Sequence, residues 1–141
     1  MSFNKVVIVE AKRTPIGSFM GSLSKIPATL IGAKSIESSI KSISLKTNLI
    51  DEVYFGNVLQ AGVGQAPARQ SAIFAGISKD VPCTTINKVC SSGMKSVSIA
   101  AQSIVLGHNN VVVAGGMENM SMSPHYLNLR RGLKFGERTL K

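Results

Sequence analysis

The sequence lacks tryptophan and has only two cysteines and seven acidic residues among its 141 residues. Two cysteines, Cys83 and Cys90, are too few for the disulfide framework of a small secreted domain. No apolar run approaches the roughly 18 residues of a membrane helix, and Val6–Val9 is far shorter than the hydrophobic region of a signal peptide. These absences favour a cytoplasmic protein with reduced cysteines and predict no membrane association.

Because acidic residues are scarce, the chain is strongly basic, with 16 Lys and Arg and a formal net charge of +9 at pH 7. Such a charge suits a polyanionic partner, but five of the basic residues crowd into positions 130–141. Only one aromatic residue, Phe135, accompanies them, so this region lacks the interleaved aromatic and basic residues of a nucleic-acid surface. We therefore predict no nucleic-acid partner.

The pattern of apolar residues predicts alternating strands and helices. Short runs rich in valine and isoleucine predict strands, and segments whose apolar residues recur every three or four positions predict helices. The strands are expected over 5–10, 51–59, 84–89 and 111–116, and the helices over 30–43, 66–77 and 91–106. This βαβαβαβ order predicts an α/β fold with a mostly parallel sheet, right-handed crossovers and helices on both faces.

The character of the sequence changes after position 118. Ser121, Ser123 and Pro124 open a loop, and 125–141 is polar, basic and without a clear period. We therefore predict an α/β domain over 1–118, followed by a different segment over 119–141. That segment is either a surface tail or the first part of a further unit.

Cys90 is the strongest candidate for chemistry because it lies where a predicted strand ends and a predicted helix begins, in NKVCSSGMKS. The free N–H groups and the positive dipole end of a helix N-terminus stabilise a thiolate, the form of cysteine that acts as a nucleophile. The N–H of Cys90 itself could stabilise a developing oxyanion, and Gly93 allows a substrate to approach closely. The alternative is a structural cysteine that packs as a small hydrophobic residue.

Few other residues could assist such a cysteine. A general base is normally required, yet the only histidines are His108, in the turn after the last predicted helix, and His125, in the polar tail. Glu118 follows the last predicted strand, at the edge where parallel sheets bind ligands. It is either a functional acid or a carboxylate that holds a glycine-rich loop by hydrogen bonds. Cys83 and Cys90 are seven positions apart without a CxxC partner, so we predict no metal site.

Gly62 and Gly64 in QAGVGQAP lie between a predicted strand and a predicted helix, as the glycines of a dinucleotide-binding loop do. Pro67 occupies the position of the third glycine of that fingerprint, which weakens the match. A dinucleotide-binding module is therefore the alternative from a different functional class, and binding of NAD(P)H distinguishes it.

Four stretches of the sequence together resemble the thiolase family. NKVCSSGMKS around Cys90 is similar to the family's acyl-enzyme cysteine motif, and AGGMENMSMSPH (114–125) is similar to its second signature. EAKRTPIGSFMGSL (10–23) resembles its N-terminal segment, and GQAPARQSA (64–72) the segment before the cysteine strand. The four stretches occur in the family's order across nearly the whole chain. NKVC and GGMENMS are more similar to the biosynthetic branch, the acetyl-CoA acetyltransferases, than to the long-chain degradative branch.

The resemblance implies an acyltransferase that works on coenzyme A esters without a separate cofactor. Cys90 would attack acetyl-CoA to form an acetyl-enzyme and release CoA, with its N–H as half of an oxyanion hole. The enolate of a second acetyl-CoA would then take the acetyl group in a Claisen condensation to acetoacetyl-CoA, and thiolysis is the reverse reaction. A ketoacyl synthase-like enzyme is the alternative within the same fold.

The resemblance also implies a larger architecture of two similar βαβαβαββ halves, with a loop domain inserted in the first. The chain is expected to be an incomplete first half that stops before its last strand, with 119–141 as the start of the loop domain. His125, Arg130, Arg131 and Lys134 resemble the tetramerisation loop, so a homo-oligomer, dimer or tetramer, is expected. The family's base histidine and second reactive cysteine come from the second half. This chain alone is therefore expected to be inactive, and a truncated non-catalytic fragment is a further alternative.

Overall fold

The computed structural model describes residues 5–126 as three strands and three α-helices, with two short 3-10 helices. The elements follow in the order α1 (Ala28–Ser42), η1 (Thr47–Leu49), β1 (Glu52–Gly56), α2 (Pro67–Phe74), β2 (Cys83–Ile86), α3 (Ser92–Val105), β3 (Val112–Gly116) and η2 (Met120–Met122). All predicted helices and all predicted strands after the first are confirmed. Arg130, Arg131 and Lys134 lie outside the described residues.

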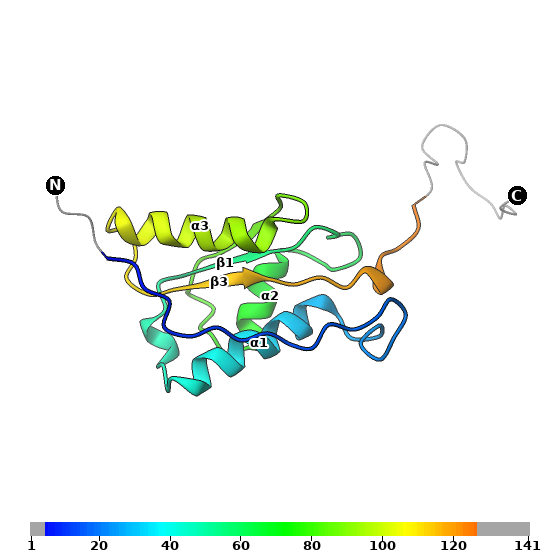
Figure 1. Cartoon of the computed structure of the whole chain (residues 1–141), viewed down its shortest axis with the longest axis horizontal. Coiled ribbons are helices and arrows are strands. Elements are labelled where there is room, and N and C mark those ends of the chain that lie inside the picture. The colour runs from blue at the N-terminus through cyan, green and yellow to red at the C-terminus, as the bar shows by residue number, and fades with distance from the viewer. Residues whose placement is uncertain (1–4, 127–141) are drawn as a thin grey trace, which may run out of the picture.

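β1 is the central strand, and it pairs in parallel with β2 on one side and with β3 on the other. The register places Tyr54 opposite Thr84 of β2 and Ala114 of β3. α3 covers one face of the sheet, and α1 and α2 cover the other (Figure 1). The predicted parallel α/β arrangement with helices on both faces is thus confirmed, and it brings the carboxyl ends of the strands to one edge.

The predicted first strand over 5–10 is wrong, because this segment is extended chain without strand pairing. A groove of about 500 Å³, lined by 6–12 and by residues of α1, α3 and β3, lies between the segment and the sheet. Val7, Ile8 and Val9 consequently remain 71, 76 and 70% exposed. Valine and isoleucine favour extended backbone, but a strand also requires hydrogen bonds to a neighbouring strand. The order of the described elements is therefore αβαβαβ.

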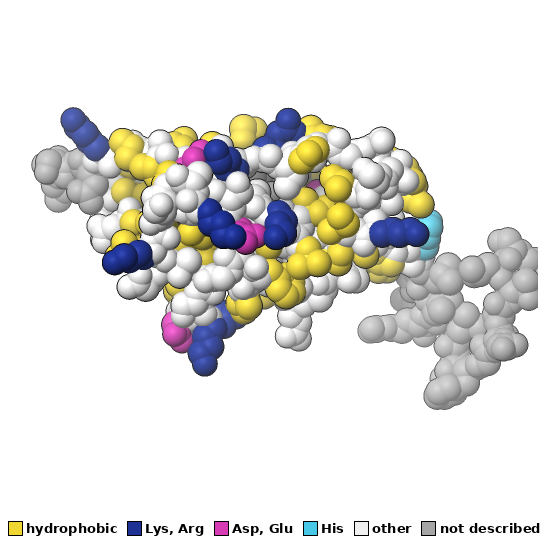
Figure 2. Space-filling model, turned by 90° about the horizontal axis from the view of Figure 1, so that it is seen from below, with side chains coloured by type: hydrophobic (Ala, Val, Ile, Leu, Met, Phe, Trp, Pro, Cys, Tyr) yellow, Lys and Arg dark blue, Asp and Glu magenta, His cyan; other side chains and the backbone are white. Residues whose placement is uncertain are grey.

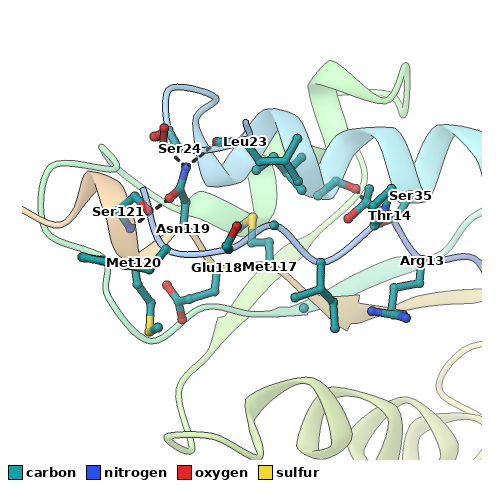
Figure 3. Close-up of a pocket in the computed structure, with 18 of the residues that line it drawn as sticks. Arg13, Thr14, Leu23, Ser24, Ser35, Met117, Glu118, Asn119, Met120 and Ser121 are labelled. Atoms are coloured by element: carbon teal, nitrogen blue, oxygen red, sulfur yellow. Dashed lines mark hydrogen bonds between the residues drawn. The ribbon is translucent and has the colours of Figure 1, made fainter. Parts of the chain in front are cut away.

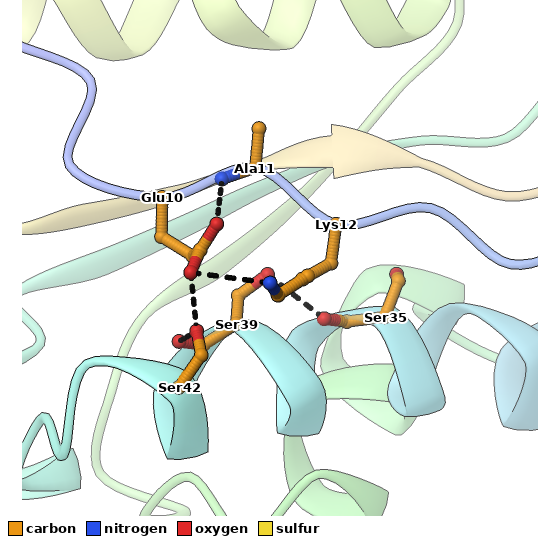
Figure 4. Close-up of polar contacts among 6 residues, drawn as sticks. All are labelled: Glu10, Ala11, Lys12, Ser35, Ser39 and Ser42. Atoms are coloured by element: carbon orange, nitrogen blue, oxygen red, sulfur yellow. Dashed lines mark hydrogen bonds and ion pairs between the residues drawn. The ribbon is translucent and has the colours of Figure 1, made fainter.

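Glu10 fastens the end of this N-terminal segment to α1 (Figure 4). Its carboxylate accepts hydrogen bonds from the Ser42 hydroxyl (2.5 Å) and the Ala11 backbone N–H (2.8 Å), and it pairs with Lys12 at 3.4 Å. The Ser42 hydroxyl above all, and then the Ala11 N–H, hold the pKa of the Glu10 carboxyl below its usual range. Because these contacts are exposed to solvent, they orient the segment without contributing much stability.

The hydrophobic core lies between α1, α2 and the sheet, and it includes the ring of Phe55 in β1, which is 3% exposed. Two glycines leave room for this ring. A Cβ atom on Gly32 of α1 would lie 2.8 Å from the Cε1 atom of the ring, and one on Gly115 of β3 would lie 2.6 Å from its Cε2 atom. α1 and β3 therefore approach the ring this closely because both positions lack a side chain.

Apolar side chains remain exposed in patches, as the face in Figure 2 shows. The loop before α1 exposes Ile16 and Phe19. On α3, which covers the opposite face of the sheet and is turned away in Figure 2, Met94 is 75% and Val97 is 42% exposed. Exposed apolar patches are typical of surfaces that contact another chain or another part of the same protein.

Gly115→Ala is expected to lower the free energy of unfolding by about 1–3 kcal/mol, because the added methyl group would overlap the Phe55 ring. Chemical denaturation of the chain measures this change. In a Phe55→Leu background, Gly115→Ala should lower the free energy of unfolding by less, since leucine removes the overlapping ring atoms. Equal losses in both backgrounds would show that the Phe55 ring is not the reason why position 115 requires glycine.

Asp51 fastens the start of β3 to the start of β1. Its Oδ2 atom accepts hydrogen bonds from the backbone N–H groups of Asn110 (2.7 Å) and Val111 (2.9 Å). These bonds, the one from Val111 above all, hold the pKa of the Asp51 carboxyl below its usual value of 3.8, although burial acts in the opposite direction. The folded state therefore favours the ionised carboxylate over the protonated acid.

The contribution of Asp51 to stability should be present well above pH 3.8, the usual pKa in an unfolded chain, and should be lost as the pH falls through the lower folded-state pKa. We expect Asp51→Asn to lower the free energy of unfolding at neutral pH and to have a progressively smaller effect in acid. Urea denaturation in steps from neutral pH down to about pH 3 tests this sign. A difference that stays constant or grows in acid would contradict it.

Candidate active site

The loops that follow the three strands lie at one edge of the sheet. β1 ends at Gly56, which is aligned with Ile86 at the end of β2 and with Gly116 at the end of β3. Cys90 lies in the loop after β2, and Glu118 follows the end of β3. The structure therefore brings both residues to the edge where parallel sheets bind their ligands.

Cys90 occupies a tight turn between β2 and α3. The Ser92 Oγ atom accepts a hydrogen bond from the Lys88 N–H (2.9 Å) and donates one to the Val89 carbonyl (2.6 Å). The Ser91 hydroxyl donates to the Lys88 carbonyl (2.9 Å). The two serines after Cys90 thus close the turn locally, and α3 begins at Ser92. The Cys90 side chain is exposed, as a nucleophile must be and as a packed structural cysteine is not.

Cys83, in β2, has different surroundings. Its side chain is half-buried, and its Sγ atom donates a hydrogen bond to the Val81 carbonyl at 3.3 Å. Burial raises the pKa of the Cys83 thiol, and the nearby Arg69 charge offsets part of that effect. A protonated thiol is a poor nucleophile, so Cys90 is the stronger candidate of the two cysteines.

Val89, directly before Cys90, adopts a left-handed backbone conformation with φ of +49°. Branched side chains rarely occupy this region, and the cost is on the order of 1–3 kcal/mol. Two hydrogen bonds hold Val89 there: its N–H donates to the Asn87 Oδ1 atom (3.1 Å), and its carbonyl accepts from Ser92. The sequence carries no sign of this conformation, because valine gives no turn signal.

Three glycines let the first turn of α3 lie directly on the strand ends. A Cβ atom on Gly56 of β1 would lie 2.7 Å from the backbone carbonyl carbon of Ser92. One on Gly116 of β3 would lie 3.2 Å from the Cα atom of Gly93. The helix therefore contacts the strands backbone to backbone, and the Cys90 turn is held over the sheet edge by this contact.

Glu118 holds the loop after β1. One carboxylate oxygen accepts hydrogen bonds from the Asn57 side-chain amide (2.9 Å) and the Leu59 N–H (3.2 Å), and the other accepts from the Val58 N–H (2.9 Å). Of the two interpretations of Glu118, the structure supports the carboxylate that holds a loop by hydrogen bonds.

Asn119 ties the loop before α1 to the end of β3. Its side-chain amide donates to the carbonyls of Leu23 (3.2 Å), Ser24 (3.3 Å) and Ile26 (2.7 Å), and its Oδ1 atom accepts from the Ser121 N–H (3.1 Å). Figure 3 shows Asn119 with Leu23, Ser24 and Ser121 among the residues that line a cavity of about 440 Å³. Cys90 is not among the residues that line it, so this cavity is separate from the candidate nucleophile.

No sequence pattern described above indicated a role for Asn57, Asn87 or Asn119. A signal for the first two exists, because each follows directly after the last residue of a strand, at the edge where ligands of parallel sheets bind. Asparagine side chains at such positions both donate and accept hydrogen bonds to loop backbone. Asn87 and Asn119 do both here, whereas Asn57 donates to the Met117 carbonyl and its buried Oδ1 atom accepts no hydrogen bond from the described residues.

The structure does not place His108 or His125, the two histidines considered as possible bases, next to Cys90. His108 is exposed and follows the end of α3, whereas Cys90 precedes its start, so the 14-residue helix separates them by about 20 Å. His125 is exposed near the end of the described residues, and no hydrogen bond joins it to the Cys90 turn. Within residues 5–126, no three His, Cys, Asp or Glu side chains converge on a possible metal site. In the same range, no helix has the length and apolar character to cross a membrane.

The loop that contains Gly62 and Gly64 forms hydrogen bonds with the neighbouring helix α2. Both glycines have positive φ, and the Gln70 side-chain amide of α2 donates to the carbonyls of Val63 (3.0 Å) and Gln65 (2.8 Å). A dinucleotide site requires backbone N–H groups that face the pyrophosphate at the start of the helix. At the start of α2, the Ala68 N–H instead donates to a threonine hydroxyl of β2 (3.0 Å). This geometry disfavours the dinucleotide-binding alternative.

Val89→Gly is expected to raise the free energy of unfolding by about 1 kcal/mol, because glycine adopts φ of +49° without the steric cost of a branched side chain. Val89 is 65% exposed, so its removal forfeits little apolar burial. Val63→Gly is the matched control, since this loop valine lies outside the left-handed region and should lose stability. Denaturant titrations measure the free energy of unfolding of both variants. A loss of stability in Val89→Gly would contradict the claim that the Val89 backbone is strained.

Comparison with known families agrees with the four motifs and their order. Residues 6–141 match the family model described as the N-terminal domain of thiolase. The match includes Cys90 and the segment that contains Glu118 and Asn119.

The chain is 57% identical over 136 residues to acetyl-CoA acetyltransferase 2 of Arabidopsis thaliana, covering 96% of this chain and 34% of that protein. It is 53% identical over 136 residues to the cytosolic acetyl-CoA acetyltransferase of Gibberella zeae, with coverage of 96% and 34%. It is 54% identical over 135 residues to the mitochondrial acetyl-CoA acetyltransferase of Danio rerio, with coverage of 96% and 32%. The chain thus spans about a third of the length of these relatives. With a family model that matches nearly its whole length, the chain belongs to the thiolase family.

Proposed function

We propose that the protein carrying this chain is an acetyl-CoA acetyltransferase that works through an acetyl-Cys90 intermediate. The observation that carries the proposal is the placement of Cys90, an exposed thiol on a strained turn directly before α3, at the ligand-binding edge of a parallel sheet. The names of the relatives, which are acetyl-CoA acetyltransferases, support acetyl-CoA as the substrate.

In the first step, the Cys90 thiolate attacks the thioester carbon of acetyl-CoA and forms a new C–S bond. The negative charge that develops on the carbonyl oxygen requires hydrogen-bond donors, and the backbone N–H of Cys90 is proposed as one of them. The C–S bond to coenzyme A then breaks, and the departing CoA sulfur takes up a proton. The product is a thioester between the acetyl group and Cys90.

In the second step, a base removes a proton from the methyl carbon of another acetyl-CoA. The resulting enolate attacks the acetyl carbon on Cys90, a C–C bond forms, and the Cys90 thiolate leaves as acetoacetyl-CoA is released. Within the described residues, neither histidine is hydrogen-bonded to the Cys90 turn. We therefore propose that the base, and the acid that protonates CoA, come from outside residues 5–126.

Further assignments rest on the same family membership. The proposed organisation is an N-terminal thiolase domain over 1–118 and the start of an inserted loop domain over 119–141. His125, Arg130, Arg131 and Lys134 are proposed to contribute to a homo-oligomer, and the exposure of His125 and of the apolar patches supports this. A cytoplasmic location is proposed as well. Among the relatives, that of Gibberella zeae is named cytosolic and that of Danio rerio mitochondrial.

Incubation with acetyl-CoA is expected to add the mass of one acetyl group to the protein that carries this chain, and peptide mapping should locate the group on Cys90. Cys90→Ala should abolish this labelling. It should also lower the rate of acetoacetyl-CoA thiolysis on the order of 10⁶-fold, as loss of a covalent nucleophile does in other enzymes. Intact mass spectrometry and a thiolysis assay measure the two effects.

Cys83→Ala is the matched control, because Cys83 is half-buried in β2 and its thiol pKa is raised. This variant should be acetylated and should turn over like the unaltered protein. Acetylation of another residue, or none at all, would overturn the proposal. Binding of NAD(P)H without acetylation would favour the dinucleotide-binding alternative instead.

A further inference from the structure

A continuous path of hydrogen bonds runs from Glu118 to the residue before Cys90. The Glu118 carboxylate accepts from the Val58 N–H at 2.9 Å. The carbonyl of the same residue, Val58, accepts from the Asn87 side-chain amide at 3.3 Å. The Asn87 Oδ1 atom in turn accepts from the Val89 N–H at 3.1 Å. The path thus crosses all three loops at the ligand edge of the sheet, and it ends at the strained residue that orients Cys90.

The Glu118 end of the path is fixed by several contacts. Asn57 is 1% exposed, and its side-chain amide donates both to Glu118 (2.9 Å) and to the Met117 carbonyl (3.3 Å). The Leu59 N–H adds a further hydrogen bond to Glu118. Among residues 5–126, no lysine or arginine forms an ion pair with Glu118, so its carboxylate is oriented by amide donors of the loop after β1.

The Asn87 end of the path acts on a conformation that the chain does not adopt by itself. Val89 has φ of +49°, where a branched residue is strained. The hydrogen bond to Asn87 favours this conformation over the extended one. If Val89 relaxed to extended backbone, the N–H and the thiol of Cys90 would change direction, because both belong to the next residue. Covalent chemistry is sensitive to a displacement of about 1 Å.

We propose that Asn87 and Glu118 are positioning residues for Cys90, with Glu118 fixing the loop after β1 and Asn87 passing that position on to Val89. Neither side chain is assigned contact with substrate or a proton transfer. The consequence for acetyl transfer rests on the function proposed above, whereas the consequence for the geometry of the turn does not.

Asp51 offers a matched control for Glu118. It also accepts two backbone N–H groups, those of Asn110 (2.7 Å) and Val111 (2.9 Å), and it also fastens β3 to β1. Asp51 lies at the start of these strands, whereas Glu118 follows the end of β3. Asp51→Asn therefore has a comparable structural effect at the end of the sheet away from Cys90.

The test compares Asn87→Ala, Glu118→Gln and Asp51→Asn in the protein that carries this chain. Single-turnover acetylation by acetyl-CoA should slow about 10–100-fold in the first two variants, with little change in the acetyl-CoA concentration that gives half the maximal rate. Asp51→Asn should acetylate like the unaltered protein. Because Asn87 is exposed, its replacement leaves the core intact and keeps the test valid where Glu118→Gln folds poorly.

Two further variants separate the path from a general structural effect. Asn87→Asp keeps the acceptor for the Val89 N–H but loses the donor to Val58, so it should acetylate faster than Asn87→Ala. The double variant Asn87→Ala with Glu118→Gln should be no slower than the slower single variant, since both act through one path. Losses that multiply in the double variant, or equal rates in Asn87→Asp and Asn87→Ala, would overturn the proposal.

Alkylation of Cys90 by iodoacetamide distinguishes failure of this proposal from failure of the proposed function. If the unaltered protein is not acetylated, the function fails, and alkylation still reports the geometry of the turn. Asn87→Ala and Glu118→Gln should then alkylate at Cys90 at rates that differ from those of the unaltered protein and Asp51→Asn, because the turn that positions the exposed thiol loses its hydrogen bonds. Equal alkylation rates in all four proteins would overturn the positioning role by themselves.

Discussion

The contact between the first turn of α3 and the ends of β1 and β3 is the constraint from which the geometry of the candidate site follows. Gly56, Gly93 and Gly116 allow the two backbones to meet without intervening side chains. A methyl group at Gly56 would collide with the helix backbone, which cannot move aside as a flexible side chain can. Cys90 precedes this turn and therefore takes its position from the sheet rather than from contacts of its own.

A second consequence of the same packing is that the loops around α3 need anchors that do not occupy the contact. Two carboxylates provide them. Asp51 holds backbone N–H groups at the start of β3, and Glu118 holds those of the loop after β1. Backbone N–H donors satisfy a carboxylate without a bulky cation. Both ends of β3 are thereby fastened to β1 or to its loop, while the space over the strand ends remains available to the Cys90 turn.

Much of this arrangement could be predicted from the sequence where packing and local preference agree. The periodic apolar residues of α1 predict this helix because their burial and their backbone preference point the same way. The apolar period of α3 also predicts a helix, but its buried residues are Ser92, Ser96, Ala100 and Ser103, whereas Met94 and Val97 of the apolar stripe are exposed. The valine run of β3 forms the predicted strand, and its valines are half-buried. The four motifs predict the family through their sequence and their order along the chain. The prediction of a strand over 5–10 is wrong because local preference is not sufficient there. Its valines favour extended backbone, but whether that backbone pairs depends on distant residues, which no local pattern reports.

The backbone conformation of the Cys90 turn could not be predicted from the sequence, because its residues contradict local conformational preference. Val89 is a poor turn residue in the left-handed region, and Asn87 acts through a loop about thirty positions away. Such contradictions concentrate at functional sites, where surrounding contacts hold the backbone in a conformation that the local sequence disfavours.

The choice of valine also has a physical consequence for Cys90. A glycine at position 89 would adopt the same φ without strain, but it would also populate many other conformations, so the orientation of Cys90 would spread over a range. A branched residue has fewer alternatives: besides the strained left-handed conformation, it adopts the extended and the right-handed helical ones. Once the hydrogen bonds of Asn87 and Ser92 select the left-handed one, the backbone around Cys90 is confined to a narrow region. Strain at Val89 thereby restricts the orientation of Cys90, provided that the loops on either side hold it in place.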